Sequence, residues 1–435
     1  MCIRDRIPVL YNPTGADRIA AIQRPAKSAD DLKGVVSSVF NAVKEQGDQA
    51  LIDFTSRYDG VALKSLSIGQ STITAAIALL DSTLKESIEQ AYLNIRSFHE
   101  SQQLKSDKVI TSPGVTCWRE YRAIEAVGLY IPGGTAPLFS TALMLGVPAQ
   151  IAGCEQVILC SPPDRSGGLH PAIIFAASLC GIDEIYTVGG SQAIAAMTLG
   201  TETIPRVHKI FGPGNQYVTA AKIMAQDYQV AIDLPAGPSE VLVYADSEAS
   251  PDYIAADLLS QAEHGVDSQV VLVSMNDMIF EKVQRSLDLQ LYVLPREGIA
   301  RQAMANSRFV CFDELQDAFD FINEYAPEHL IILSDQYESY IPMIKNAGSV
   351  FLGHNTPESA GDYASGTNHT LPTAGYAKSY SGVSLDSFVK KVTFQHITKE
   401  GLLDLGPHIV TMANAEQLEG HANAVTVRMN DIEKS

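Results

Sequence analysis

The feature that most constrains the fold is the order strand, glycine turn and helix, repeated along residues 126–235. The segment "AVGLYIPGGTAPLFSTALMLGVPAQIAG" has this order, and "EIYTVGGSQAIAAMTLG" and "HKIFGPGNQYVTAAKIMA" repeat it. Strands that alternate with helices are typical of a parallel sheet with crossover helices. A second alternating series begins at "EVLVYAD" and includes "SQVVLVS" and "HLIILS". The sequence therefore predicts an α/β fold with two parallel-sheet domains, each incompletely Rossmann-like.

The rest of the chain divides around these two domains. A chain of 435 residues is expected to form roughly two to four domains. Its N-terminal part has mostly helical periodicity, and we expect this helical region to pack with the second α/β domain. The last fifty or so residues have the pattern of a small appendage. The predicted domains are residues 1–125, 126–235, 236–380 and 381–435.

Composition argues against two kinds of partner. A formal net charge of −19 disfavours nucleic acid, which attracts basic surfaces, and anionic membranes. No apolar run reaches the ~18 residues of a membrane span, and "MCIRDR" lacks the apolar segment of a secretory signal. The six cysteines show no C-x-x-C spacing, which indicates reduced thiols and a cytoplasmic protein.

Three glycine turns of the first domain could bind phosphate. They are Gly133-Gly134, Gly189-Gly190 and Gly212-Pro213-Gly214, and each precedes a predicted helix. A helix N-terminus offers free N–H groups and the positive end of the helix dipole. None of the turns matches the dinucleotide motif G-x-G-x-x-G. A turn that only needs positive φ explains the glycines equally well.

Two pairs of polar residues could bind a metal or a substrate. Gln261 and His264 are three residues apart near the end of a predicted helix, so both can project from one face. Such a pair offers a metal one oxygen and one nitrogen, but it is also compatible with a polar helix end. Asp362 and His369 lie in a predicted loop of small polar residues, which is typical of binding loops and also of solvated turns.

Two further pairs combine a glutamate with a histidine. Glu416 and His421 fall in a short helical stretch near the C-terminus, where an exposed helix end is the simpler interpretation. Glu328 and His329 follow a proline in "NEYAPEHLIIL", directly before an apolar strand. An adjacent Glu and His can act as base and acid if both face one cavity. Catalytic groups of open sheets usually follow strands rather than precede them, so a structural turn remains the alternative.

Together these stretches resemble histidinol dehydrogenase over nearly the whole chain. The motifs that carry the resemblance are "YIPGGTAPLFSTALM", "FGPGNQYVTAAK", "DLPAGPSE", "LLSQAEHGVDSQ", "APEHL" and "GDYASGTNHTLPT". That family oxidises L-histidinol to L-histidine in two steps through a bound aldehyde, and each step reduces one NAD⁺. The resemblance therefore implies a zinc- and NAD-dependent oxidoreductase of histidine biosynthesis, with Mn²⁺ as a possible substitute for zinc.

The resemblance also implies a role for individual residues. Glu328 and His329 match the catalytic pair. The implied zinc ligands are Gln261, His264, Asp362 and His421. The implied substrate contacts are these four together with Ser239, His329, His369 and Glu416. The implied NAD contacts are Tyr130, Gln192 and Asn215. In the family the position of His421 serves the neighbouring subunit, so a homodimer is implied in which residues 381–435 complete the partner's site.

Three alternative functions stay open at this point. The same scaffold could oxidise another amino alcohol with zinc. A protein that binds metal and nucleotide without catalysis would need a lost ligand or a lost base, and the motif positions are intact. A metallohydrolase would use Gln261, His264 and Glu328, but it would leave the glycine turns unexplained.

Overall fold

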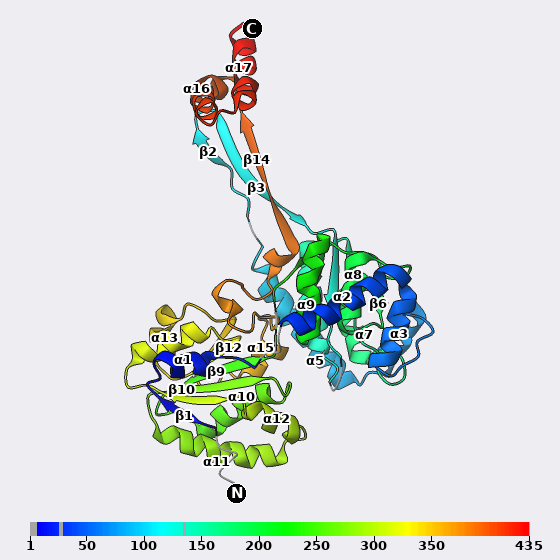
Figure 1. Ribbon diagram of the computed structural model, residues 1–435, viewed down its shortest axis with the longest axis vertical. Helices are drawn as coiled ribbons and strands as arrows, with labels where there is room; N and C mark the ends of the chain where they lie inside the picture. The colour runs from blue at the N-terminus through cyan, green and yellow to red at the C-terminus, as the bar shows by residue number, and fades with distance from the viewer. Residues whose placement is uncertain (1–6, 26–28, 104, 134–135, 236, 435) are drawn as a thin grey trace.

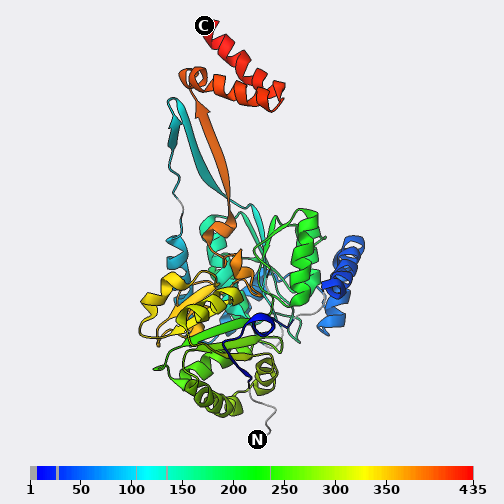
Figure 2. The ribbon, with the colours of Figure 1, turned by 60° about the vertical axis from the view of Figure 1, so that its left-hand side comes forward.

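The computed structural model describes residues 7–25, 29–103, 105–133, 136–235 and 237–434. The segment "MCIRDR" and Gly134 of the first predicted turn lie outside the described residues. Two lobes lie side by side, and a long arm projects from them and carries the two last helices (Figures 1 and 2). Among the described residues, no helix is both long and apolar enough to cross a membrane. The five described cysteines are free thiols, as predicted.

The first lobe is built on a five-stranded sheet in the order β6-β5-β4-β7-β8, with every pair parallel. Its strands are β4 (Ala126–Tyr130), β5 (Gln156–Cys160), β6 (Glu184–Tyr186), β7 (Lys209–Phe211) and β8 (Ala231–Ile232). Its crossover helices are α6 (Phe139–Ala152), α7 (Pro171–Leu179), α8 (Gly190–Leu199) and α9 (Gln216–Ala225), followed by η2 (Gln226–Tyr228). All residues of the central strand β4 are buried, because helices cover both faces of a parallel sheet.

The second lobe is built on a six-stranded sheet in the order β1-β11-β10-β9-β12-β13, again entirely parallel. Its strands are β1 (Val9–Tyr11), β9 (Glu240–Ala245), β10 (Gln269–Ser274), β11 (Arg308–Cys311), β12 (His329–Leu333) and β13 (Ser349–Leu352). Its helices are α1 (Gly15–Ile22), α10 (Pro251–Ala262), α11 (Met278–Val293), α12 (Glu297–Met304), α13 (Leu315–Tyr325), α14 (Tyr337–Tyr340), η3 (Ile341–Met343) and α15 (Glu358–Tyr363). Two parallel sheets confirm the predicted fold class.

The predicted packing of the N-terminal helices is wrong. The helices concerned are α2 (Ala29–Gln46), α3 (Asp48–Tyr58), α4 (Gln70–Leu79) and α5 (Ser82–Glu100). They pack on the first lobe, where α2 contacts α8 and α9, α4 contacts α7, and α5 contacts α6 and α7. The reason is their apolar faces: Phe40 of α2 joins the core of Ile158, and Ile95 of α5 joins that of Leu143. Of the helices and strands that the structure describes in the N-terminal region, β1 and α1 alone belong to the second lobe.

The arm corrects a second predicted boundary. It is an antiparallel sheet in the order β14-β3-β2, from strands β2 (Val109–Ser112), β3 (Val115–Ala123) and β14 (Val389–Ile397). Before β14 come η4 (Tyr376–Lys378) and η5 (Leu385–Phe388), and after it α16 (Lys399–Ala415) and α17 (Glu419–Lys434). The C-terminal appendage is therefore not built from residues 381–435 alone, because strands expected in the helical N-terminal region complete its sheet.

Candidate active site

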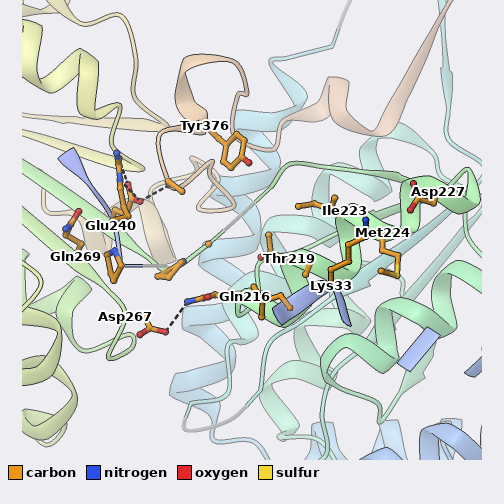
Figure 3. A pocket seen from close by; sticks show the side chains of 17 residues that line it. Lys33, Gln216, Thr219, Ile223, Met224, Asp227, Glu240, Asp267, Gln269 and Tyr376 are labelled. Carbon is orange, nitrogen blue, oxygen red and sulfur yellow. Dashed lines mark hydrogen bonds and ion pairs between the residues drawn. The ribbon is translucent and has the colours of Figure 1, made fainter. Parts of the chain in front are cut away.

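Two cavities lie along the seam between the lobes. One, of about 540 Å³, has mostly apolar walls from α9 and the second lobe (Figure 3), and none of the described residues that line it is a predicted site residue. The other, of about 560 Å³, contains most of the predicted site. Its predicted lining residues are Asn215, Ser239, Gln261, His264, Glu328, His329, Asp362 and His369. The second cavity is therefore the candidate active site.

Opposite edges of the two sheets face each other across this cavity. In the first lobe, Pro132 follows β4 and Asn215 follows β7, so that wall is the carboxyl edge of the sheet. This is where open α/β sheets bind ligands, at the point where the strand order reverses. In the second lobe, Ser239 precedes β9 and His329 is the first residue of β12, so that wall is an amino edge. The position of the Glu-His pair before a strand is thus compatible with a site, because a second sheet supplies the usual edge.

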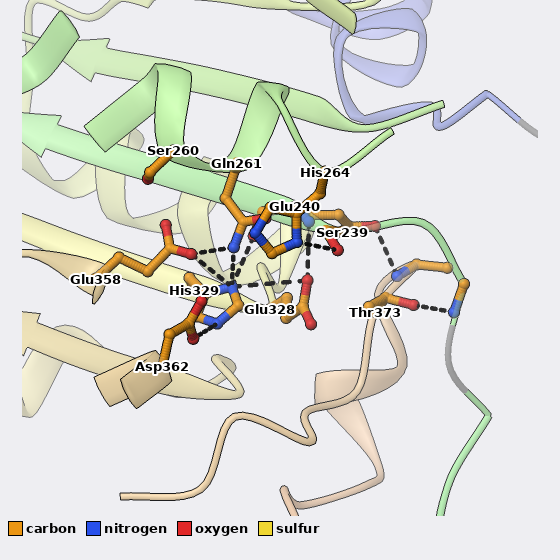
Figure 4. Close-up of polar contacts among 12 residues, drawn as sticks. Ser239, Glu240, Ser260, Gln261, His264, Glu328, His329, Glu358, Asp362 and Thr373 are labelled. Atoms are coloured by element: carbon orange, nitrogen blue, oxygen red, sulfur yellow. Dashed lines mark hydrogen bonds and ion pairs between the residues drawn. The ribbon is translucent and has the colours of Figure 1, made fainter. Parts of the chain in front are cut away.

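His329 lies at the centre of the polar cluster (Figure 4). Its Nδ1 is 3.0 Å from the carbonyl oxygen of Glu240, and a carbonyl only accepts, so Nδ1 carries a hydrogen and donates it. Gln261 Nε2 is also 3.1 Å from Nδ1, and Glu358 accepts the hydrogen bond of this amide. The other ring nitrogen, Nε2, lies 3.5 Å from Oδ1 of Asp362. It is therefore Nε2 that can exchange a proton with a molecule in the cavity.

Glu328 is buried and bound to the same peptide. Its Oε2 accepts a hydrogen bond of 2.8 Å from the backbone N–H of Glu240 and lies 3.6 Å from His329 Nδ1. Burial raises the pKa of Glu328 to about 8. In its ionised form such a carboxylate is a stronger base than an exposed glutamate, but near neutral pH most of the group carries a proton, so it must lose that proton before it acts as a base.

Carboxyl groups surround the imidazole on several sides. Burial lowers the pKa of His329, but Glu358, Glu328 and Asp362 together raise it well above its ordinary value. Burial raises the pKa of Asp362, yet its interactions with His329, His369 and His264 together outweigh burial and lower that pKa below the ordinary value. Burial raises the pKa of Glu358 well above its ordinary value. So much buried acid near one cavity favours a bound cation.

Several donor atoms in the cavity fit a zinc ion. Oε1 of Gln261 and Oδ1 of Asp362 are buried and, within the described part of the chain, accept no hydrogen bond. Glu358 holds the amide nitrogen of Gln261, which leaves Oε1 as the free end. Burial lowers the pKa of His264, so its imidazole is neutral, as a metal ligand must be. Nitrogen and oxygen donors of this kind suit zinc, and donor atoms of His329, Glu358 and Asp362 also lie within 4.8 Å of one another.

Some predicted site residues differ from expectation in local structure. α10 ends at Ala262, so His264 lies beyond the helix and not on one helical face with Gln261. Asp362 is on α15 and not in a loop. His369 lies in the following loop, where its Nδ1 donates to the carbonyl of Asp362 at 2.8 Å and its Nε2 is 3.0 Å from the Thr141 hydroxyl. Burial lowers the pKa of His369.

The predicted NAD contacts form two groups. Tyr130 and Gln192 are buried and meet at the second glycine turn, where the Gly190 N–H donates to the Tyr130 hydroxyl at 3.0 Å. Tyr130 thus supports the turn, Gln192 lies in the first turn of α8, and neither is among the described residues that line the cavity. Asn215 lines the cavity and caps α9, accepting hydrogen bonds from Tyr217 and Val218. Gly190 has a φ of 65°, which by itself favours glycine. The backbone conformation therefore explains this glycine without a bound phosphate, and it is equally compatible with one.

A buried ion pair that sequence reasoning missed holds the third glycine turn. Lys222 pairs with Asp233 at 2.5 Å and donates to the Gly212 carbonyl at 2.7 Å. The Gly212 N–H donates to Asp233 at 2.7 Å, and its φ is 128°. A Cβ at Gly212 would lie 2.1 Å from the Tyr130 carbonyl oxygen. The turn is therefore fixed closely against β4.

Glu416 and His421 are not brought to the cavity. Glu416 caps the end of α16 and His421 lies on α17, both exposed at the far end of the arm (Figure 1). Within this chain the donor set therefore consists of residues from the second lobe alone.

Asp257, one turn before Gln261 on α10, offers a stability test of this acidic region. Burial raises its pKa to about 7, so the folded state keeps a proton that the unfolded chain releases, and stability falls as pH rises towards 7. We expect Asp257→Asn to stabilise the protein at pH 8, with a gain about 3 kcal/mol smaller near pH 5. Urea unfolding at both pH values measures this, with the exposed Asp404→Asn as control. A gain independent of pH would contradict the prediction.

Comparison with known proteins agrees with the geometry. The sequence family described as "Histidinol dehydrogenase" matches residues 22–429. Histidinol dehydrogenase of Bacteroides thetaiotaomicron is 53% identical over 411 residues, which cover 94% of this chain and 96% of that protein. That of Photobacterium profundum is 50% identical over 416 residues, 95% and 93% of the two chains. The crystal structure of histidinol dehydrogenase from Elizabethkingia anophelis has a TM-score of 0.95 and 53% identity, and the match covers 98% of this chain and 99% of that one.

Proposed function

The chain belongs to the histidinol dehydrogenase family, and on that premise we propose that it oxidises histidinol with NAD⁺ and one zinc ion per subunit. The family establishes the reaction class, an oxidoreductase acting on histidinol in histidine biosynthesis. Oxidation of a different amino alcohol is not favoured. The observation that carries the proposal is the group of unpartnered buried donor atoms beside Glu328 and His329.

Gln261, His264 and Asp362 would hold the zinc, with His421 of a second subunit as the fourth protein ligand. A zinc ion here would bind the substrate's nitrogens and orient its carbinol carbon, which is the template role of a catalytic metal. Ser239 supports this arrangement, since its hydroxyl is 3.4 Å from Nδ1 of His264. His369, Glu416 and Ser239 would contact the rest of the substrate.

In the first oxidation His329 would take the hydroxyl proton on Nε2. Its surrounding carboxylates favour the protonated ring, so this role requires a nearby cation to lower its pKa. NAD⁺, when bound, would supply the hydride acceptor for each oxidation. The glycine turns beside Tyr130, Gln192 and Asn215 would seat this cofactor on helix N-termini.

In the second oxidation Glu328 would remove a proton from water as the water oxygen bonds to the aldehyde carbon. The product of that addition is a hydrate, whose carbon again carries a hydrogen that can leave as hydride. His329, whose Nδ1 lies 3.6 Å from Glu328, would give the aldehyde oxygen the proton that its Nε2 took up in the first oxidation, so that the addition yields a neutral hydrate. Two adjacent groups held by one peptide would thus serve two chemically different oxidations.

A homodimer would complete each site. The arm exposes apolar side chains, among them Ile110 at 73%, Met412 at 66% and Val427 at 50%, and apolar surface of this kind is typical of an interface. We propose that α16 and α17 carry Glu416 and His421 to the cavity of the partner. The free cysteines support a cytoplasmic location.

Metal removal tests the proposal. We expect two NADH for each histidinol consumed, loss of this activity with a chelator, and recovery when zinc is added back. Metal analysis should find one zinc per subunit, and His264→Asn should lower that content because a ligand is lost. Full activity in metal-free protein would contradict the zinc role, and one NADH per substrate would contradict the double oxidation.

A further inference from the structure

The Glu240 peptide contacts both proposed catalytic side chains. Its N–H donates to Glu328 at 2.8 Å and its carbonyl accepts from His329 at 3.0 Å. We propose that the Arg24–Glu240 ion pair is a positioning device that sets this peptide, and through it the geometry of both groups. The proposal rests on the catalytic roles proposed above for Glu328 and His329. Neither Arg24 nor Glu240 was a predicted site residue.

Arg24 binds the Glu240 carboxylate with two parallel hydrogen bonds. Its Nε donates to Oε1 at 3.1 Å and its Nη2 to Oε2 at 3.0 Å. The guanidinium also lies 3.7 Å from the centre of the Tyr325 ring. The side chains of Arg24 and Glu240 are only 16% and 2% exposed. A forked, stacked and buried pair fixes direction as well as distance, which a lysine could not do.

The same pair reaches the two loops that border the site. Arg24 Nη2 donates to the carbonyl of Tyr325 at 2.6 Å, and Glu240 Oε1 accepts from the N–H of Ala374 at 2.7 Å. Ala326, directly before the Pro-Glu-His segment, has a φ of 52°, and Ala374 has a φ of 54°. Such backbone persists only where surrounding contacts hold it, and it is common at functional sites. Arg24 and Glu240 thus anchor both strained corners and the peptide between the catalytic groups.

Arg24 can be reached without entering the active site. It lines the cavity of about 540 Å³, together with Glu240, Gln269 and residues of α9 (Figure 3). This cavity and the active-site cavity share Gln216, Gly237, Pro238 and Asp267 in their walls, so they adjoin along the segment before β9, and only the first is lined by Arg24. Shortening Arg24 to alanine would therefore open space that a free guanidinium ion can enter from outside.

Chemical rescue tests this role. We expect Arg24→Ala to lower kcat for both half-reactions by about 100-fold, the effect of a small misplacement of catalytic groups, while the KM for histidinol and the zinc content stay close to wild type. Millimolar guanidinium should restore part of the lost kcat. Arg18→Ala is the matched control, because Arg18 also pairs with a glutamate of the second lobe, Glu324, and lies over the ring of Phe321. The control should keep its kcat and ignore guanidinium.

Two further variants keep the test decisive. If Arg24→Ala fails to fold, Arg24→Lys retains the charge without the fork, and we expect an intermediate kcat with unchanged KM. Wild-type kcat in Arg24→Lys, or a folded Arg24→Ala of normal kcat, would overturn the positioning role, as would loss that guanidinium never restores. Glu328→Gln, assayed in parallel, distinguishes failure of the proposed function from failure of the positioning role. If this variant is fully active, the proposed catalytic role of Glu328 is wrong, whatever the result for Arg24.

Discussion

Glu328→Gln should lower the oxidation of histidinaldehyde about a thousand-fold, while histidinol oxidation falls far less. A positioned general base contributes roughly 10²–10⁴-fold to a proton transfer, and only the aldehyde step requires a proton to be taken from water. Glutamine keeps the size of the side chain and can still accept the hydrogen bond from the Glu240 N–H, so the fold of the site should persist. Feeding alcohol and aldehyde separately and measuring NADH from each gives the two rates.

The half-buried Glu324→Gln on α13 is the control for this substitution. Glu324 lies near the same strand entrance but pairs with Arg18 outside the active-site cavity, so both rates should remain close to wild type. Equal loss of both half-reactions in Glu328→Gln would remove the water-activation role from this residue. The carboxyl group would then act on the alcohol as well, or only hold His329 in place.

Mixing two inactive variants should restore activity if sites are shared between subunits. In a hybrid dimer, the His421→Ala subunit supplies an intact Glu328, and the Glu328→Gln subunit supplies an intact His421. One of the two sites therefore contains both residues. Random exchange makes half of the dimers hybrid, each with one complete site of two, so we expect about a quarter of wild-type activity. With histidinaldehyde as the substrate, each variant alone should be nearly inactive.

The exposed His408→Ala on α16 is the control for the arm. It should remain active alone, because the proposal gives His408 no ligand role. Subunit exchange can be verified with mass-tagged chains. If exchange occurs and activity still does not recover, each site is self-contained. His421 would then need another role at the end of the arm.

The fold class could be predicted because its signal is local. Each strand or helix can be recognised from a short stretch of sequence, and their alternation predicts both parallel sheets. The packing of α2 to α5 could not be predicted in this way, since an amphipathic face does not identify its partner. The arm was missed for a related reason: β3 pairs with β14 across more than two hundred residues of chain.

The site shows the same limit. Glu328 and His329 were ambiguous from spacing, because their function depends on groups that arrive from α10, α15 and β9. Glu358 was missed although a signal existed: it lies four residues before Asp362, so both can share one face of a helix. No signal of this kind exists for Arg24, whose partner Glu240 is far away in sequence.

The path of the chain between the lobes limits how such an enzyme can be divided or recombined. The chain begins in the second lobe with β1 and α1, and then builds the first lobe from α2 to α9, apart from the arm strands β2 and β3. It returns to the second lobe from β9 to α15, and η5 finally packs against α6 of the first lobe. Neither lobe is therefore a continuous piece of sequence. A gene cut between them would leave one product without an edge strand and the other without part of its core. We expect such an architecture to be inherited whole, with additions tolerated at its ends rather than exchanges within.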